Sequence, residues 1–141
     1  MVDYHLVECP ALVDHYIELS GPIGPDSTEA LSRLLKLVDG CRENESDVRT
    51  RITIFLNSSG GLLYDGFKLG ELFRENKVST SIVGGQSCAS SCATAFLGGV
   101  RRRIYDDGSL LFHAPYTQNR QRINCIEKDK MQSLMIYYQD M

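Results

Sequence analysis

Apolar and polar residues alternate in two rhythms along the first part of the chain. Residues 16–20 (Y-I-E-L-S) have the two-residue period of a β-strand, and a Gly-Pro pair ends it. A helical period follows, because Asp26 and Glu29 have the spacing of a capping box and Gly40 supplies a C-terminal stop. The pattern predicts a strand and then a helix, whose apolar stripe is Ala30, Leu31, Leu34, Leu35 and Val38.

The same order of strand, turn and helix occurs twice more. Residues 51–56 (R-I-T-I-F-L) have the strongest strand pattern in the chain, and they lead into the turn 57–61 (N-S-S-G-G). Residues 78–83 predict a further strand, which leads into the small-residue segment 84–99 and a short helix at 93–97. The helix between these two strands is predicted to have an inner stripe of Leu62, Gly66, Leu69, Leu72 and Phe73.

The last part of the chain has shorter patterns. Residues 102–105 and 110–112 predict two short strands joined by a turn at 106–108, and the apolar positions of 123–138 recur at helical spacing. Strands alternate with helices three times, and a glycine-containing turn follows each of the first three strands. We therefore predict an α/β fold with a largely parallel sheet. A length of 141 residues fits one domain with a real core.

Composition and charge exclude several functional classes. Apolar residues make up 43% of the chain and charged residues 23%, which is ordinary for a globular protein. A net charge of −3 gives no electrostatic case for nucleic-acid binding, so the arginines at 101–103 are interpreted as a solvated strand edge or a ligand-facing rim. No apolar run approaches the roughly 20 residues of a membrane span, and the N-terminus lacks the layout of a signal peptide. We expect a cytoplasmic protein, unless a leader has been removed.

The chain has five cysteines, an odd number without C-x-x-C spacing. This pattern argues against a structural zinc site, and we expect neither a metal nor a cofactor. Cys88 and Cys92 are four residues apart and flank a serine pair. We expect them to be buried free thiols, or a local disulfide if the compartment is oxidising.

Features with chemical potential follow three of the predicted strands: Gly60-Gly61, Ser90-Ser91 and His113. In acyl transfer by serine, the hydroxyl loses its proton to a base, and preorganised N–H groups stabilise the oxyanion. A double glycine offers N–H donors that no side chain obstructs. Two other interpretations remain open. The serine pair could be a small-residue helix start packed against a sheet, and the glycines could hold a phosphate, although no G-K-[ST] or G-x-G-x-x-G motif is present.

Four short motifs occur in the order found in the Clp protease proteolytic subunit and the wider ClpP/crotonase superfamily. The segment 54–61 (I-F-L-N-S-S-G-G) resembles the strand followed by S-P-G-G, and 86–90 (Q-S-C-A-S) resembles the G-x-x-A-S before the nucleophile. The segment 112–115 (F-H-A-P) resembles I-H-x-P, and 21–23 (G-P-I) resembles an early motif of the family. A nearer match is a ClpP-like subgroup with C-x-S-x-C, here at 88–92.

The resemblance covers about residues 15–138. It implies repeated β-β-α units in a single ClpP-like domain spanning 1–141, shortened at its C-terminus relative to the full family domain. It also implies a C-terminal handle-type helix and a homo-oligomer, with peptide or unfolded protein as substrate and an ATP-dependent unfoldase as a possible partner. The helix would contact its mate through Met131, Leu134, Met135 and Tyr138, although these residues would also serve as core.

The resemblance implies that Ser90 is the nucleophile and His113 the general base. Ser91 is the rival of Ser90, because one residue of register decides which side chain lies at the bend. The N–H groups of Gly61 and Ser91 would form the oxyanion hole, with Gly60 beside them. The start of the edge that pairs with an extended peptide would be Leu62 and Leu63.

The chain departs from the family pattern at the third catalytic residue, because no position matches the aspartate that follows the last helix. Four explanations are open: the domain is truncated, a Ser-His dyad suffices, another carboxylate substitutes, or the protein is inactive. Without an orienting carboxylate, the imidazole tautomer is not fixed and a large loss of rate is expected. The substitutes considered are Asp106, Asp107 and Asp129.

Three functions are compatible with these motifs. The first is a ClpP-like serine peptidase with a Ser-His pair and a Gly-Gly oxyanion hole. The second is a catalytically inactive relative that serves as an oligomeric scaffold or binding protein. The third is an acyl-CoA enzyme of the crotonase branch, although the chain supplies no clear counterpart of that branch's glutamate.

Overall fold

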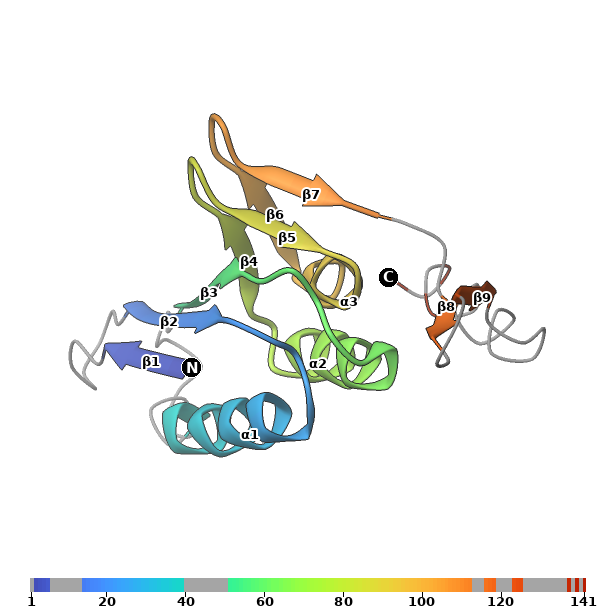
Figure 1. The fold of residues 1–141 in the computed structure, drawn as a ribbon. Coiled ribbons are helices and arrows are strands. Elements are labelled where there is room, and N and C mark those ends of the chain that lie inside the picture. Colours follow the sequence, from blue (N-terminus) through green and yellow to red (C-terminus); the bar gives the residue numbers. More distant parts are fainter. Residues whose placement is uncertain are drawn as a thin grey trace.

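A parallel sheet organises the molecule (Figure 1). The computed structural model describes residues 2–5, 14–39, 51–112, 116–118, 123–125, 137, 139 and 141. Five strands form the main sheet in the order β1-β2-β3-β4-β6, in which β1 is antiparallel to β2 and the other pairings are parallel. The prediction of an α/β fold with a largely parallel sheet is therefore confirmed. The bounds are β1 Val2–His5, β2 Asp14–Ser20, β3 Arg51–Asn57, β4 Ser79–Ile82 and β6 Arg101–Ile104.

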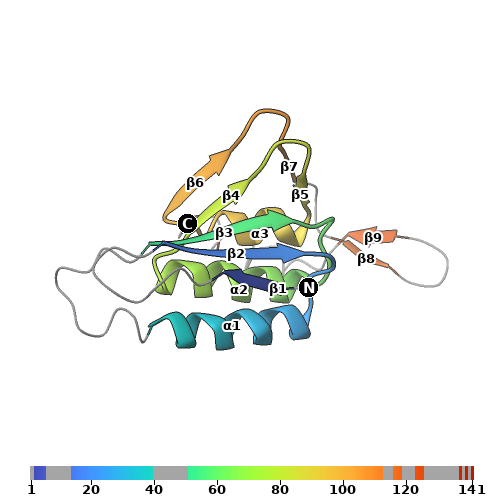
Figure 2. The ribbon, with the colours of Figure 1, turned by 90° about the vertical axis from the view of Figure 1, so that its left-hand side faces the viewer.

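A second, smaller sheet continues the strands of the first. Strands β5 (Ser87–Ala89) and β7 (Ser109–Leu111) pair in parallel, and a single bridge joins Ser58 to Cys88 on the other side of β5. Thus the segments that follow β3, β4 and β6 each contribute to this second layer. A similar bridge between Ile23 and Gly61 follows β2. The order strand, strand and helix is complete for β4, β5 and the helix that follows them, whereas β3 is followed by the single bridge of Ser58 and then by a helix (Figure 2).

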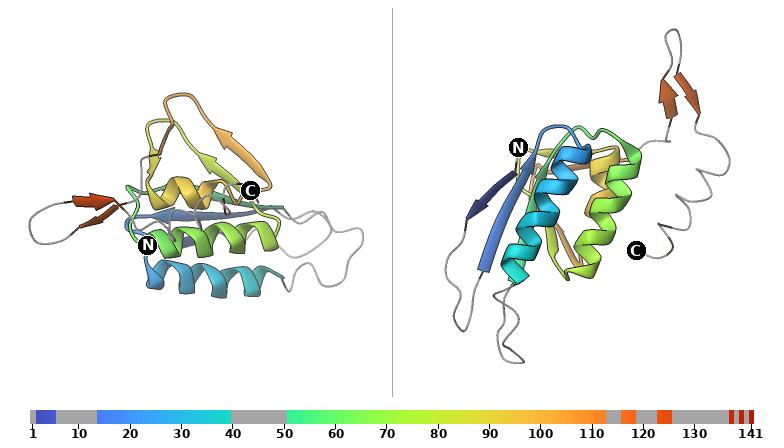
Figure 3. Two further views of the ribbon diagram at one scale, coloured as in Figure 1. Left: turned by 90° about the vertical axis from the view of Figure 1, so that its right-hand side faces the viewer. Right: turned by 90° about the horizontal axis from the view of Figure 1, so that it is seen from below.

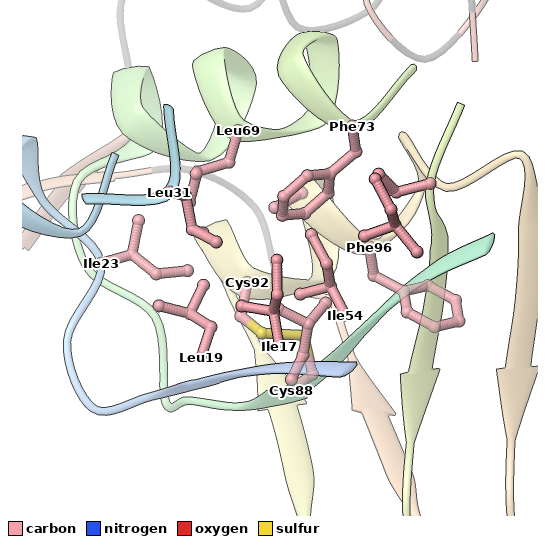
Figure 4. Close-up of a cluster of buried hydrophobic side chains, with 14 of the residues drawn as sticks. Ile17, Leu19, Ile23, Leu31, Ile54, Leu69, Phe73, Cys88, Cys92 and Phe96 are labelled. Carbon is pink, nitrogen blue, oxygen red and sulfur yellow. A yellow bond between two sulfur atoms is a disulfide. The ribbon is translucent and has the colours of Figure 1, made fainter. Parts of the chain in front are cut away.

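Three helices cover the main sheet on one face (Figures 2 and 3). They are α1 (Pro25–Asp39), α2 (Leu63–Glu75) and α3 (Ser91–Phe96). Alternate residues of β2 and β3 are buried, as the two-residue period requires, because one face of each strand points to the helices. Figure 4 shows these side chains meeting those of the helices, with the sulfur atoms of two cysteines among them. Fully buried core residues include Ile17, Leu19, Ile54, Leu56, Leu69 and Phe73.

The start of α1 differs from the prediction. Asp26 lies inside the helix, which begins at Pro25, so Asp26 is not the cap. Instead, the Ser27 hydroxyl accepts a hydrogen bond from the Gly24 N–H at 3.0 Å and donates to the Gly24 carbonyl at 2.9 Å. Proline fits the first helical position because it has no N–H to leave unpaired.

The end of the chain also differs from the prediction. Residues 123–125 are strand β9 (Ile123–Cys125), antiparallel to β8 (Tyr116–Gln118), so a helix over 123–138 is wrong at its start. Tyr137 and Gln139 are helical. Met131, Leu134, Met135 and Tyr138, the expected contact stripe of the handle helix, lie outside the described residues. Strands β1, β5 and β8 were not predicted.

Candidate active site

Ser90 lies at a sharp bend between β5 and α3. Its backbone has φ 59° and ψ −126°, a conformation that side-chain-bearing residues rarely adopt. The Ser90 N–H donates to the Leu111 carbonyl of β7 at 3.0 Å, and the Ser90 carbonyl accepts from the Thr94 N–H at 3.2 Å. Such residues cost of order 1–3 kcal/mol and persist only where the surrounding structure holds them, which is typical of functional sites.

Ser91, the rival residue, is placed differently. It is the first residue of α3 and is 1% exposed, whereas Ser90 is half-buried. Its Oγ has no hydrogen-bond partner among the described residues. A Cβ added to Gly66 of α2 would lie 2.6 Å from the Ser91 carbonyl oxygen and 2.8 Å from the Ser91 Cβ. Ser91 is therefore packed against the α2 backbone, and Ser90 occupies the bend.

The glycine pair after β3 lies against Ser90. Gly60 has φ +106°, and an added Cβ would lie 2.6 Å from the Ser90 Cβ and 3.1 Å from its Oγ. The turn is fixed by the buried Ser58 hydroxyl, which accepts the Gly60 N–H at 3.0 Å. No side chain is possible at Gly60 without moving Ser90, so the backbone of this turn directly adjoins the serine.

Gly61 has both a structural role and a free donor. An added Cβ would lie 2.0 Å from the Ile23 carbonyl oxygen, so the bridge between the two segments requires glycine here. The neighbours of Gly61 make the two bonds of this bridge. Its own N–H donates to no described residue. The Ser91 N–H, as the first of a helix, also has no intrahelical acceptor. The N–H groups of Gly61 and Ser91 therefore have no backbone acceptor in the part of the chain that the structure describes.

A disulfide spans the bend. Cys88 in β5 and Cys92 in α3 are bonded, with their Cα atoms 5.2 Å apart, and both are fully buried. Figure 4 shows the sulfur pair within the cluster of core side chains. The structure thus has the local disulfide in place of the free thiols that the composition alone favoured.

Leu62 and Leu63 lie at the start of α2, whereas we predicted that they begin an edge that pairs with an extended peptide. The Leu62 N–H already donates to the Ile23 carbonyl at 3.0 Å, and Leu63 is the first residue of α2. The Leu62 side chain is 57% exposed. Leu111 and Phe112, which were not predicted as site residues, are also exposed and lie at the end of β7 beside Ser90. An apolar surface therefore adjoins the bend.

His113 and Asp129 lie outside the described residues. Asp106 and Asp107 occupy the turn that joins β6 to β7. This turn contacts Gly84 and Gly85, which precede β5, while Ser90 follows the end of β5. The strand separates these two carboxylates from Ser90, so neither is placed to orient a base beside it.

A groove in the described part of the structure lies away from Ser90. A groove of about 500 Å³ lies between α1 and α2, and Tyr64, Lys68 and Glu71 are among its lining residues. Ser90 does not line it. No described helix has the length and apolar character needed to cross a membrane.

Comparisons with solved structures assign the fold. A serine-to-alanine mutant of the 1510-N membrane-bound stomatin-specific protease matches with TM-score 0.68 and 14% identity, over 92% of this chain and 61% of that one. A lysine-to-alanine mutant of the same protease, in complex with a substrate peptide, matches with TM-score 0.70 and 16% identity, over 92% and 58%. An asparagine-to-aspartate mutant of ClpP1 from Listeria monocytogenes matches with TM-score 0.61 and 20% identity, over 86% and 64%.

The chain has the ClpP-like fold. At 14–20% identity the matches show the architecture alone, and the chain spans only 58–64% of the length of these proteins. No family model and no curated protein matches the sequence. The expected architecture is thereby confirmed, while the roles of Ser90, His113 and the glycines stay predictions.

The ClpP-like fold brings together most of the predicted site. Ser90, Ser91, Gly60 and Gly61 converge from the ends of β3 and β5, although β5 itself was not foreseen. Sequence reasoning missed Ser58, whose side chain fixes the glycine turn, and Leu111, whose carbonyl holds the Ser90 N–H. The only signal for Ser58 was its place in N-S-S-G-G, since small polar residues often bond to the backbone of their own turn.

Proposed function

We propose that this chain is a serine peptidase that hydrolyses peptide bonds through an acyl-enzyme on Ser90. The observation that carries the proposal is the bend at Ser90. A serine occupies a backbone conformation that favours glycine, beside a glycine turn that leaves room for nothing else. A structural role alone would be filled more cheaply by glycine. The ClpP-like fold of the neighbours supports the same interpretation.

In the proposed reaction, the Ser90 Oγ attacks the scissile carbonyl carbon while His113 accepts the hydroxyl proton. The carbonyl oxygen becomes an oxyanion, to which the N–H groups of Gly61 and Ser91 donate. The C–N bond then breaks, and His113 returns the proton to the leaving amine. Water attacks the resulting ester while His113 accepts its proton, the acyl C–O bond breaks, and His113 passes that proton to the Ser90 oxygen as the acid product leaves.

His113 is proposed as the base on sequence grounds. It follows Leu111 by two residues, and the Leu111 carbonyl is hydrogen-bonded to Ser90. Two residues of chain span at most about 7 Å, so the tether allows an imidazole to reach the Ser90 hydroxyl. The orienting carboxylate has no candidate among the described residues that adjoin Ser90.

Substrate and assembly are part of the proposal. Exposed Leu62, Leu111 and Phe112 favour an extended peptide or unfolded protein with apolar side chains. A homo-oligomer and an ATP-dependent unfoldase as partner are proposed from the family resemblance alone. The cytoplasmic location expected from the sequence stays a prediction. The 1510-N protease is named as membrane-bound and stomatin-specific, and we carry neither property over to this chain.

Labelling by a fluorophosphonate, followed by intact mass, tests the proposal. We expect a single adduct on the unmodified chain and on Ser91→Ala, and none on Ser90→Ala. His113→Gln is expected to slow labelling by about 10²–10⁴-fold, because the hydroxyl then has no base.

An adduct lost in Ser91→Ala and kept in Ser90→Ala would reverse the assigned register. No adduct on folded protein would contradict the peptidase and favour the inactive scaffold. Binding of a CoA thioester without labelling would favour the crotonase-type enzyme instead.

A further inference from the structure

The Cys88–Cys92 disulfide takes no part in the proposed reaction. It joins the middle of β5 to the first turn of α3, and Ser90 lies midway between its two cysteines. Its ring contains only the bend: Ala89, Ser90 and Ser91. Both cysteines are 0% exposed and pack in the core with residues of β2 and β3 (Figure 4). The bond therefore ties the two sides of the bend together from inside the molecule.

Three backbone hydrogen bonds hold the same bend from outside the ring. The Ala89 N–H donates to the Ser58 carbonyl at 2.9 Å, and the Ser90 N–H donates to Leu111 at 3.0 Å. The Thr94 N–H donates to the Ser90 carbonyl at the longer distance of 3.2 Å. Both shorter bonds hold the β5 side. The Thr94 bond ends at Ser90 itself, whereas the disulfide joins β5 to α3 across Ser90.

We propose that Cys88 and Cys92 are positioning residues whose disulfide holds Ser90 in its reactive conformation. The proposal rests on the peptidase function for its catalytic consequence. Without the bond, the unfavourable φ of Ser90 relaxes, because the helix side is no longer tied to β5. The hydroxyl then leaves its place beside the Gly60-Gly61 turn, and reactivity falls. The oxidised chain is the active form.

Loss of the bond is a two-electron reduction. A dithiol reductant gives two electrons and two protons, the S–S bond breaks, Cys88 and Cys92 become thiols, and the reductant becomes a disulfide. Both sulfur atoms are buried, so the reductant must wait for the bend to open. The thiols that form are small and apolar enough to remain in the core. Reduction is therefore expected to change the bend without unfolding the domain.

The experiment uses the full chain with Cys9, Cys41 and Cys125 replaced by serine, so that a single cysteine pair remains. Intact mass and thiol titration first establish the oxidised and dithiothreitol-reduced forms. Fluorophosphonate labelling then gives the maximal rate constant and the concentration for half-maximal rate. We expect the maximal rate constant to fall about 10- to 100-fold on reduction, with the half-maximal concentration changed little, because a small misplacement of a reacting group has this effect.

The double variant Cys88→Ala/Cys92→Ala is the matched control. It should label as slowly as the reduced chain, and dithiothreitol should not change its rate. Rates are measured well below the unfolding temperature of each form, so that a loss of stability alone leaves them unchanged. Equal maximal rates in the oxidised, reduced and double-variant proteins would overturn the proposal.

Hydrogen exchange separates this proposal from the peptidase function. The Ser90 amide should exchange at least about tenfold faster after reduction, since its bond to Leu111 depends on the bend. The Ile54 amide in β3 serves as the internal control and should not change. Absence of labelling in both forms would overturn the peptidase function, and the Ser90 exchange rate would still decide whether the disulfide holds the bend. Unchanged exchange, or free thiols after oxidative refolding, would overturn the positioning role.

Discussion

Ser90 carries the main conflict between local preference and tertiary structure in this chain. Serine at φ 59° is unfavourable, and Ser90 keeps this conformation beside the Gly60 turn with its N–H bonded to the Leu111 carbonyl. The Ser90 hydroxyl makes no capping hydrogen bond to the helix that begins at the next residue. A residue that is strained and half-exposed beside free backbone donors is a better nucleophile candidate than a serine chosen by composition.

The cost of that conformation can be measured by substitution. We expect Ser90→Gly to be more stable to unfolding than Ser90→Ala by about 1 kcal/mol. Alanine bears the Cβ penalty of positive φ, and this penalty is larger than the extra chain entropy that glycine loses on folding. Urea unfolding of both variants gives the difference. Neither variant should accept a fluorophosphonate.

Ser32 in the middle of α1 is the matched control, because it has ordinary helical surroundings. There we expect the opposite order, with Ser32→Gly less stable than Ser32→Ala by about 1 kcal/mol. The same order at both positions would mean that Ser90 is not strained.

At the level of elements, α2 and α3 are brought close by a glycine. Gly66 is buried in α2, and the backbone of Ser91 fills the place of its missing side chain. The sequence placed Gly66 on an inner helical stripe and so anticipated close packing. The partner was not predictable from the sequence, because contact with α3 depends on how the two crossovers pack on the sheet.

Gly66→Ala is predicted to lower the free energy of unfolding by about 2 kcal/mol, because the added Cβ would lie 2.6 Å from the Ser91 carbonyl oxygen. Helix propensity alone gives the opposite sign, a gain of about 1 kcal/mol. Chemical denaturation distinguishes the two. Gly24→Ala is the control, since no atom lies within 4 Å of an added Cβ there, and it should change stability by less than about 1 kcal/mol. A stabilised Gly66→Ala would contradict this packing.

At the scale of the whole molecule, long periodic segments were predictable and short ones were not. Strand β3 and helices α1 and α2 follow from their apolar periods. Strand β5 (S-C-A) has no strand propensity, and its partners β7 and Ser58 are distant in sequence. Strand β9 was not predicted, because the apolar positions of 123–138 recur at helical spacing and include its residues. The double glycine at 84–85 was expected to lead directly into the serine bend, but it forms the turn into β5.

The part of the site that lies in recognisable sequence motifs was predictable. Sequence order placed Gly60, Gly61 and Ser90 together, since they follow neighbouring predicted strands, although β5 of the second sheet precedes Ser90 in the structure. Register decides between Ser90 and Ser91, and register depends on the three residues of β5. The disulfide also depends on the fold. It conflicts with the expected cytoplasmic location, because disulfides persist mainly in oxidising compartments.

The last described residues, Tyr137 and Met141, contact helices α2 and α3. The Tyr137 hydroxyl donates to the Thr94 carbonyl of α3 at 2.6 Å, and its ring lies against Phe67 and the Gly70 backbone of α2. The Arg74 guanidinium donates to the Met141 carbonyl at 3.0 Å. The chain end therefore packs on the two helices that meet behind the serine bend.

Tyr137→Phe is predicted to lower the free energy of unfolding by about 1–2 kcal/mol, because it removes a buried hydrogen bond and keeps the ring. Tyr64→Phe on the exposed face of α2 is the control and should have no effect, since Tyr64 is 66% exposed. Thermal unfolding of both variants gives the comparison. Equal stability of the two would mean that the chain end does not support α3. If Tyr137→Phe lowers the free energy of unfolding and also slows labelling of Ser90, the chain end helps to position the proposed nucleophile. The link would be Thr94, whose N–H donates to the Ser90 carbonyl.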